Sequence, residues 1–88
     1  MDAIAEVKQA MKEGTIVIGS EKTMKLLRQS KVKKIFLASN TSKKAREEIM
    51  HYSSIAKVPV ELLSITNEDV GTMCKKPFSI SVLSVRSE

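Results

Sequence analysis

Two kinds of apolar pattern alternate along this chain, and their alternation limits the folds that it can adopt. Short β-branched runs predict strands at 15–18, 32–38, 60–65 and 80–85. Apolar residues that recur every three or four positions predict amphipathic helices at 2–13, 20–29 and 42–56, and a short helix follows Thr66. Helices and strands that alternate at this spacing predict an α/β fold with a sheet between helices.

The predicted helices begin and end at residues that favour helix termini. Gly14 ends the first helix, Ser20 is expected to be the N-cap of the second, and Thr66 with Asp69 resembles a capping box before the fourth. Polar residues at 40–42 supply capping groups for the third helix. Its buried stripe is expected to contain Ala45, Ile49, Tyr52 and Ala56.

Length and composition predict a single domain over residues 1–88. With no Trp and only Phe36, Tyr52 and Phe78 as aromatic residues, the core must be aliphatic. Cys74 has neither a disulfide partner nor the companions of a zinc site, which favours a reducing compartment. No apolar run approaches the roughly 20 residues of a membrane span, and the first residues lack the pattern of a signal peptide. We therefore expect a cytoplasmic protein without a membrane partner.

Basic residues are concentrated in one part of the chain. The window from Lys22 to Arg46 contains nine Lys and Arg residues and no Asp or Glu, within a chain of net charge +5. Such a surface attracts a polyanion, and nucleic acid is the commonest large one in cells. A solvated helix face with a charged strand rim would give the same pattern. Charge alone therefore leaves both interpretations open.

The sequence offers little support for catalysis. His51 lies in the middle of a predicted helix, and it is interpreted as an ordinary, partly exposed residue. Lys75 and Lys76 could lower the pKa of Cys74, although a single Cys more often acts as a small apolar residue. No glycine-rich phosphate loop or carboxylate pair is present. We expect no enzyme, no metal site and no cofactor. A small α/β enzyme and a module for an acidic protein partner are the alternatives from other classes.

Three junctions between predicted elements carry residues suited to RNA. Gly19 precedes a helix whose free N–H groups could face a phosphate, with Lys22 and Lys25 on its first turns. Asn40 follows a buried strand, where it could contact a ligand or simply cap a helix. The third junction is a Pro-stiffened loop in which Phe78 follows two lysines. An exposed Phe78 could stack on an unpaired base, and the alternative is a ring that folds into the core.

These residues resemble the L-thirty-e family of archaeal and eukaryotic large-subunit ribosomal proteins, within the kink-turn RNA-binding superfamily. The resemblance covers about residues 4–86. Its central block contains Gly19, Thr23, Lys25, Leu27, Arg28, Gln29, Lys31, Lys33, Ile35, Ala38, Asn40 and Thr41. Further matches are Tyr52, Val58-Pro59-Val60, Val70-Gly71-Thr72 and Lys76-Pro77-Phe78.

The resemblance implies a three-layer α/β/α sandwich with a four-stranded mixed sheet. It also implies a protein that is monomeric when free and binds kink-turn ribosomal RNA beside neighbouring ribosomal proteins in the cytoplasm. The implied RNA-contacting residues are Gly19, Glu21, Lys22, Lys25, Arg28, Asn40, Lys76, Phe78 and Ser79.

Two of these positions bear on which branch of the superfamily the chain resembles. Relatives often carry a basic or amide residue at position 21, whereas the carboxylate of Glu21 could accept from a guanine amino group. Within the superfamily, the alternative to a ribosomal protein is a subunit of a guide-RNA or ribonuclease P particle. That branch usually has an Asn-Glu pair at positions 21–22, so Glu21-Lys22 favours the ribosomal branch.

Overall fold

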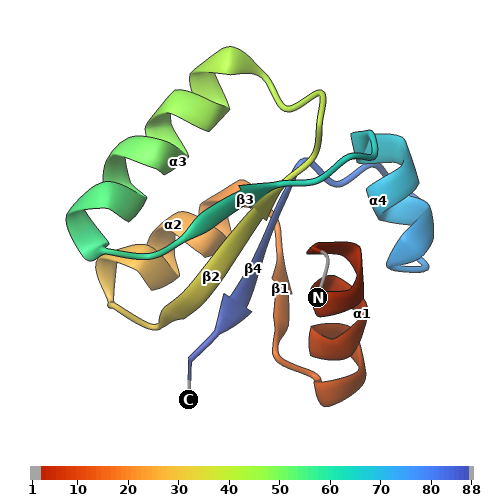
Figure 1. The fold of residues 1–88 in the computed structure, drawn as a ribbon, viewed down its shortest axis with the longest axis horizontal. Helices are drawn as coiled ribbons and strands as arrows, with labels where there is room; N and C mark the ends of the chain where they lie inside the picture. Colours follow the sequence, from red (N-terminus) through yellow and green to blue (C-terminus); the bar gives the residue numbers. More distant parts are fainter. Residues whose placement is uncertain (1–2, 88) are drawn as a thin grey trace.

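The computed structural model describes residues 3–87, and helices alternate with strands throughout this part of the chain (Figure 1). The elements are α1 (Ala3–Glu13), β1 (Ile16–Ile18), α2 (Ser20–Arg28), β2 (Val32–Leu37), α3 (Lys43–Ala56), β3 (Val60–Leu62), α4 (Asn67–Met73) and β4 (Val82–Arg86). This order confirms the predicted alternation. Asp2, the first residue of the predicted first helix, lies outside the described residues. No helix among the described residues is long and apolar enough to cross a membrane.

The four strands form one mixed sheet in the order β1-β4-β2-β3. β4 is antiparallel to both β1 and β2, with Ser84 opposite Val17 and Leu83 opposite Phe36, whereas β2 and β3 are parallel. The start of β4 therefore lies at the same end of the sheet as the ends of β1 and β2. This topology brings the three junctions singled out in the sequence to one end of the sheet.

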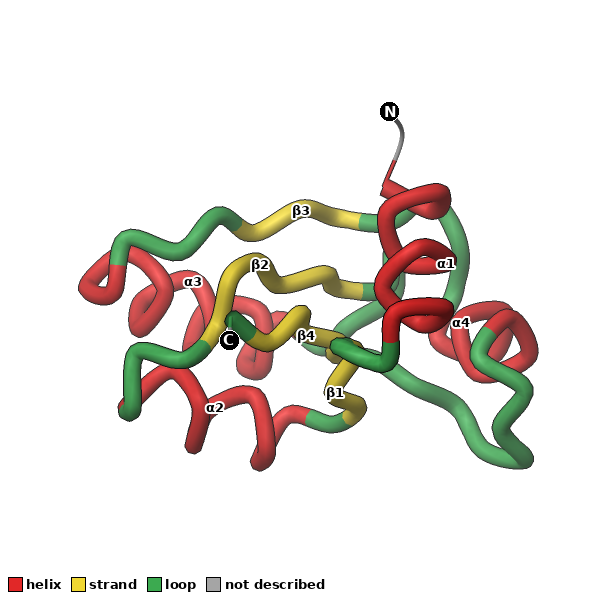
Figure 2. The backbone as a smooth tube through the Cα atoms, turned by 90° about the horizontal axis from the view of Figure 1, so that it is seen from below, coloured by secondary structure: helices red, strands yellow, loops and turns green. Residues whose placement is uncertain are grey.

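Helices cover both faces of the sheet, which confirms the three-layer sandwich. Figure 2 shows α1 and α4 on one side of the strands and α2 and α3 on the other. Val7, Val70 and Phe36 belong to the core cluster on the first side, and Leu27 and Ile49 belong to the cluster on the second. Each large apolar side chain that becomes fully buried contributes about 1.5–3 kcal/mol. The sheet is thus fixed from both faces.

Burial differs from the prediction in β1 and in α3, where Ala45 and Ala56 are half-buried. β1 was expected to be buried, but its three residues are only half-buried because β1 is an edge strand that pairs with β4 alone. Tyr52 was expected in the buried stripe of α3, but it is 37% exposed. Ser53 takes the buried position instead, four residues after Ile49, where the helical repeat returns to the same face.

Element boundaries also differ at several points. The N-cap of α2 is Gly19 rather than Ser20, and its positive φ of 110° is a conformation that favours glycine. Thr66 caps α4 as predicted, and Ser42, one of the three candidates at 40–42, caps α3. Each hydroxyl accepts a backbone N–H from three residues later. β3 ends at Leu62 rather than residue 65. β4 begins at Val82 rather than residue 80, because the Ile80 N–H donates to the Asn67 carbonyl at 2.9 Å.

Candidate nucleic-acid interface

Backbone hydrogen bonds tie the first and second junctions to the start of β4. The Gly19 N–H donates to the Val82 carbonyl at 3.0 Å, and the Ala38 N–H donates to the Ser81 carbonyl at 2.9 Å. The hydroxyl of Thr41 donates to the carbonyls of both Ala38 and Ser81, at 2.8 and 3.0 Å. The first two junctions and the end of the third therefore form one continuous region.

The first junction presents the start of α2 toward open space. A Cβ placed on Gly19 would meet no atom within 4 Å, so the space around this residue is open. Glycine is favoured here because of the positive φ. Glu21, Lys22 and Lys25 are exposed on the helix that follows. Thr23 faces inward, and its hydroxyl donates to Ser84 Oγ at 3.0 Å, which anchors α2 to the sheet. The charged side chains thus project from a fixed helix.

The second junction is held by Asn67, a residue that was not predicted from the sequence. Asn40 Oδ1 accepts the backbone N–H of Asn67 at 2.8 Å, and Asn40 Nδ2 donates to Asn67 Oδ1 at 3.1 Å. An amide has two N–H donors, so one donor of Asn40 is left for a ligand. Asn67 is the first residue of α4, where an asparagine suggests only a helix start. Its link to Asn40 spans 27 residues and has no local sequence signal.

The third junction directs Phe78 into solvent. Phe78 is 55% exposed, which rules out the alternative in which its ring folds into the core. Gly71 in α4 packs directly against this loop, because a Cβ there would lie 2.0 Å from the Phe78 carbonyl oxygen. The Lys76 N–H also donates to the Gly71 carbonyl at 2.9 Å. Gly71 therefore sets the position of the loop that carries Lys76, Phe78 and Ser79.

The acid-free segment of the sequence does not form one basic surface. Lys34 Nζ lies 2.6 Å from Glu6 Oε2 and 2.9 Å from Glu61 Oε1, so this lysine ties β2 to α1 and β3. Hydrogen bonds to Glu6 and Glu61 raise the pKa of Lys34 above its ordinary value. Within residues 3–87 no ion pair involves Lys22 or Lys25. The acid-free segment thus supplies only part of the charge at the three junctions, and Lys76 at the third junction lies outside that segment.

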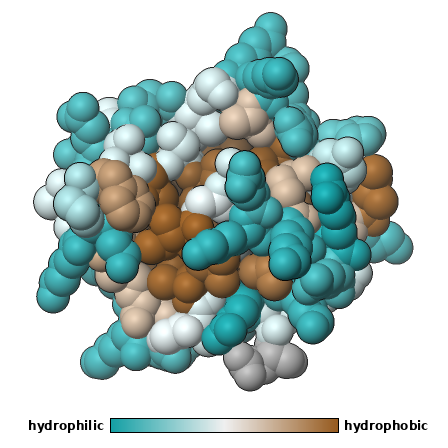
Figure 3. All heavy atoms as spheres, turned by 180° about the vertical axis from the view of Figure 1, so that it is seen from behind, coloured by the Kyte–Doolittle hydropathy of each residue, from teal (hydrophilic) through white to brown (hydrophobic). Residues whose placement is uncertain are grey.

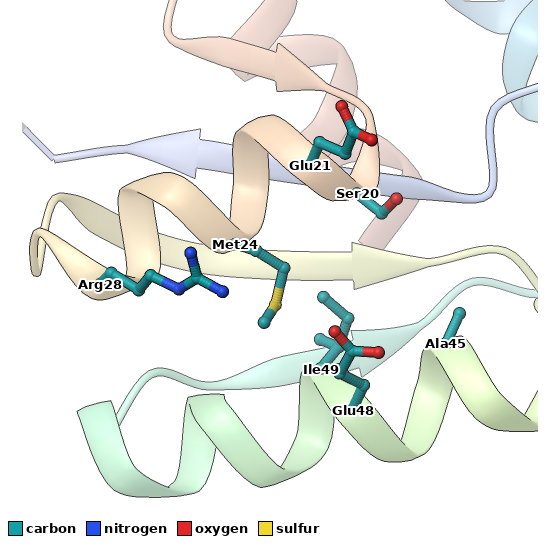
Figure 4. Close-up of a pocket in the computed structure, with 7 residues that line it drawn as sticks. All are labelled: Ser20, Glu21, Met24, Arg28, Ala45, Glu48 and Ile49. Atoms are coloured by element: carbon teal, nitrogen blue, oxygen red, sulfur yellow. The ribbon is translucent and has the colours of Figure 1, made fainter.

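A groove between α2 and α3 borders the first junction. It has a volume of about 280 Å³ and is lined by Ser20, Glu21, Met24, Arg28, Ala45, Glu48 and Ile49 (Figure 4). Figure 4 shows the Arg28 side chain reaching into the space beside Met24, whereas Glu21 points away from α3. Sequence reasoning missed Glu48, whose carboxylate lines the groove on the α3 side. A phosphate is therefore disfavoured on that side, which leaves the α2 side to the basic residues.

The two candidate catalytic side chains have ordinary structural environments. Burial raises the pKa of the Cys74 thiol above its usual value, and the nearby positive charge of Lys76 opposes this only in part. Cys74 is accordingly a small apolar residue of the core. His51 lies on the exposed side of α3, and its ring makes a T-shaped contact with the ring of Tyr52. Over residues 3–87, no cluster of three or more His, Cys, Asp or Glu residues could hold a metal ion.

Comparisons with known proteins place this geometry in a family. Residues 1–88 match the model of the ribosomal protein L7Ae/L30e/S12e/Gadd45 family. The chain is 35% identical to the large ribosomal subunit protein eL30 of Saccharolobus solfataricus, over 94% of this chain and 77% of that protein. Its identity to the protein of the same name from Branchiostoma belcheri is 37%, over 92% and 71%.

A solved structure shares the fold. The Giardia lamblia 15.5kD RNA binding protein superposes with a TM-score of 0.80 at 16% sequence identity, and the match covers 97% of this chain and 71% of that one. At this level of identity the likeness concerns the fold alone. It agrees with the three-layer arrangement of Figure 1.

Proposed function

Because the chain belongs to the ribosomal protein L7Ae/L30e/S12e/Gadd45 family, we propose that it is an RNA-binding constituent of the large ribosomal subunit. The observation that carries this proposal is the similarity to named large-subunit proteins, which extends over more than nine-tenths of the chain. The three junctions support binding rather than catalysis, because apart from Glu21 their exposed site residues carry basic, amide, hydroxyl or aromatic groups. The protein would act in the cytoplasm, on the ribosome.

The three junctions form the proposed RNA contact. Gly19 lets the RNA approach the start of α2, where Lys22 and Lys25 meet phosphates and Glu21 accepts from a guanine amino group. Arg28 extends this contact along the helix. Asn40 donates its remaining N–H from the second junction. Lys76, Phe78 and Ser79 hold an extruded base at the third.

A kinked RNA suits this arrangement physically. A sharp bend brings two phosphate backbones together, and their repulsion opposes the bend. A rigid surface that carries several cations offsets the repulsion, while contacts with unpaired bases select the bent form. The hydrogen bonds that tie Gly19, Ala38 and Thr41 to the start of β4 supply such rigidity. We infer that the free protein is a monomer and that neighbouring ribosomal proteins contact surfaces outside the three junctions.

A titration tests the proposal. The protein is added at one salt concentration to a kink-turn RNA and to a straight duplex of equal length and charge. We expect tighter binding to the kinked RNA. Equal affinity for the two RNAs would show that the protein binds RNA through non-specific charge interactions only. Sequencing the RNA that crosslinks to the protein in cells then identifies the particle. Large-subunit ribosomal RNA supports the proposal, whereas a guide RNA or ribonuclease P RNA would support the alternative branch.

A further inference from the structure

An open groove runs along the outer edge of β1. It shares Lys76 with the residues proposed above to hold the extruded base, but neither Phe78 nor Ser79 lines it. Its volume is about 450 Å³, and it is lined by the apolar residues Met11, Ile16, Val17 and Ile18 and by Lys22 and Lys76, with the buried Cys74 beneath. Figure 3, viewed from behind, shows a hydrophobic area near the middle of this face with hydrophilic side chains across and around it. All four apolar residues are half-buried rather than covered.

The backbone of β1 adds hydrogen-bonding groups to this groove. Thr15 accepts from the Arg86 N–H and Gly19 donates to the Val82 carbonyl, so these two residues direct their backbone groups toward β4. Alternation along an antiparallel ladder then places the N–H and C=O groups of Ile16 and Ile18 on the open side. An edge strand of this kind presents donors and acceptors in fixed positions.

The charged residues of the groove are both cationic. Lys22 comes from the start of α2 and Lys76 from the loop after α4, so they come from the two helical layers on opposite faces of the sheet. Lys76 lies close enough to the base of the groove for its charge to act on the Cys74 thiol. No Asp or Glu is among the residues that line it. The groove therefore combines an apolar floor, a backbone edge and a positive rim.

We propose that this groove binds one unpaired nucleotide of the RNA, with the base on the apolar edge of β1 and the phosphate at the lysine rim. The proposal rests on the proposed function, because Lys22 also belongs to the α2 contact and brings the RNA to the groove. The base edge would hydrogen-bond to the backbone of Ile16 or Ile18. A β1 of three residues offers an added peptide strand few ladder bonds, whereas the two lysines match a phosphate.

A pair of matched variants tests the groove. Val17→Glu places a carboxylate in it, and Leu62→Glu introduces a carboxylate at a 48% exposed position of β3, the opposite edge strand. We expect Val17→Glu to weaken binding of a kink-turn RNA about tenfold, in the range of one lost base contact. Leu62→Glu should change the affinity less than about twofold, since a single exposed charge has a small effect.

A set of modified RNAs identifies the nucleotide. Each unpaired residue of the kink-turn RNA is replaced in turn by an abasic residue. One abasic RNA should bind the wild-type protein about tenfold more weakly and show a much smaller further loss with Val17→Glu, because both changes remove the same contact. Additive losses at every position would overturn the proposal.

A measurement on the unmodified protein avoids any effect of Val17→Glu on folding. The methyl NMR signals of Met11, Ile16 and Ile18 should shift when the parent RNA binds and shift less with the identified abasic RNA. Unchanged methyl signals, with the kinked RNA still preferred over the straight duplex, would overturn the groove alone. Loss of that preference in the wild-type protein would instead overturn the proposed function, and the groove with it.

Discussion

Asn40 and Asn67 hold each other through two hydrogen bonds, although 27 residues separate them in sequence. Asn67 also reaches the start of β4, because its Nδ2 donates to Ser81 Oγ at 3.4 Å and its carbonyl accepts the Ile80 N–H at 2.9 Å. A single residue therefore connects the second junction with the segment that leaves the third. We infer that Asn67 positions the interface without contacting RNA.

The variant Asn67→Ala should remove the side-chain hydrogen bonds that link the second junction to the segment after the third. Loss of its side-chain hydrogen bonds is expected to lower the free energy of unfolding by about 0.5–1.5 kcal/mol and to weaken RNA binding. In a double-mutant cycle with Asn40→Ala, the two losses of RNA affinity should not add, since the residues act as one unit. Gln9→Ala is the matched control, because Gln9 makes an amide hydrogen bond to Glu13 at 2.9 Å on distant α1. Additive losses would contradict the positioning role.

Gly71→Ala should displace the loop that carries Phe78. The added Cβ would lie 2.0 Å from a backbone oxygen, which cannot move without the loop. We expect a loss of about 1–3 kcal/mol in unfolding free energy, as for other overpacked sites, together with weaker RNA binding. Denaturant titration and RNA titration measure the two effects. Thr72→Ala changes the next, exposed residue of α4 and should leave RNA affinity unchanged.

Phe78→Ala should affect binding and not folding. Removal of an exposed ring leaves no cavity, whereas the lost stacking on an unpaired base should cost about 1–3 kcal/mol of RNA affinity. Thermal melting and RNA titration of the same variant separate the effects. The control is Phe36→Ala in the core, which should destabilise the fold by about 3–5 kcal/mol. Unchanged affinity of folded Phe78→Ala would remove the third junction from the interface.

The lysines of α2 should determine the salt dependence of binding. Lys22→Ala or Lys25→Ala is expected to weaken binding and to reduce the slope of log affinity against log salt by about one per lost phosphate contact. Lys43→Ala and Lys44→Ala are the controls, because these lysines are exposed on α3 and Lys43 already lies 4.0 Å from Glu47. Equal slopes for all four variants would show that the lysines of α2 are merely solvated.

Lys34 should make stability fall at alkaline pH. Glu6 and Glu61 raise its pKa above the ordinary value, so the folded protein holds this proton more tightly than the unfolded chain does. The resulting stabilisation is complete below the unfolded pKa of about 10.4 and is lost as the pH rises through the folded pKa. The stability difference between wild type and Lys34→Met should therefore be constant below about pH 10.4 and change at higher pH, with wild type losing more. A constant difference would show that the ion pairs contribute nothing.

The positions where prediction from sequence failed share a physical cause. Tyr52 was assigned to the buried stripe because it follows Ile49 by three residues, but Ser53, which follows Ile49 by four, is the buried residue. Lys34 counted toward a basic surface, yet its partners Glu6 and Glu61 are 28 and 27 residues away and were invisible in the linear charge pattern. Asn67 and Glu48 were missed for the same reason. Each depends on which elements become neighbours.

The sequence by itself determined the order of helices and strands, the capping role of Thr66, and the three junctions, because periodicity and capping depend on neighbouring residues. Only the tertiary structure decided that β4 runs antiparallel between β1 and β2, which brings those junctions to one end of the sheet. It alone placed Gly71 beneath Phe78, joined Asn40 to Asn67 and left the edge of β1 open. These relationships arise from contacts between distant parts of the chain, and no local pattern of residues encodes them.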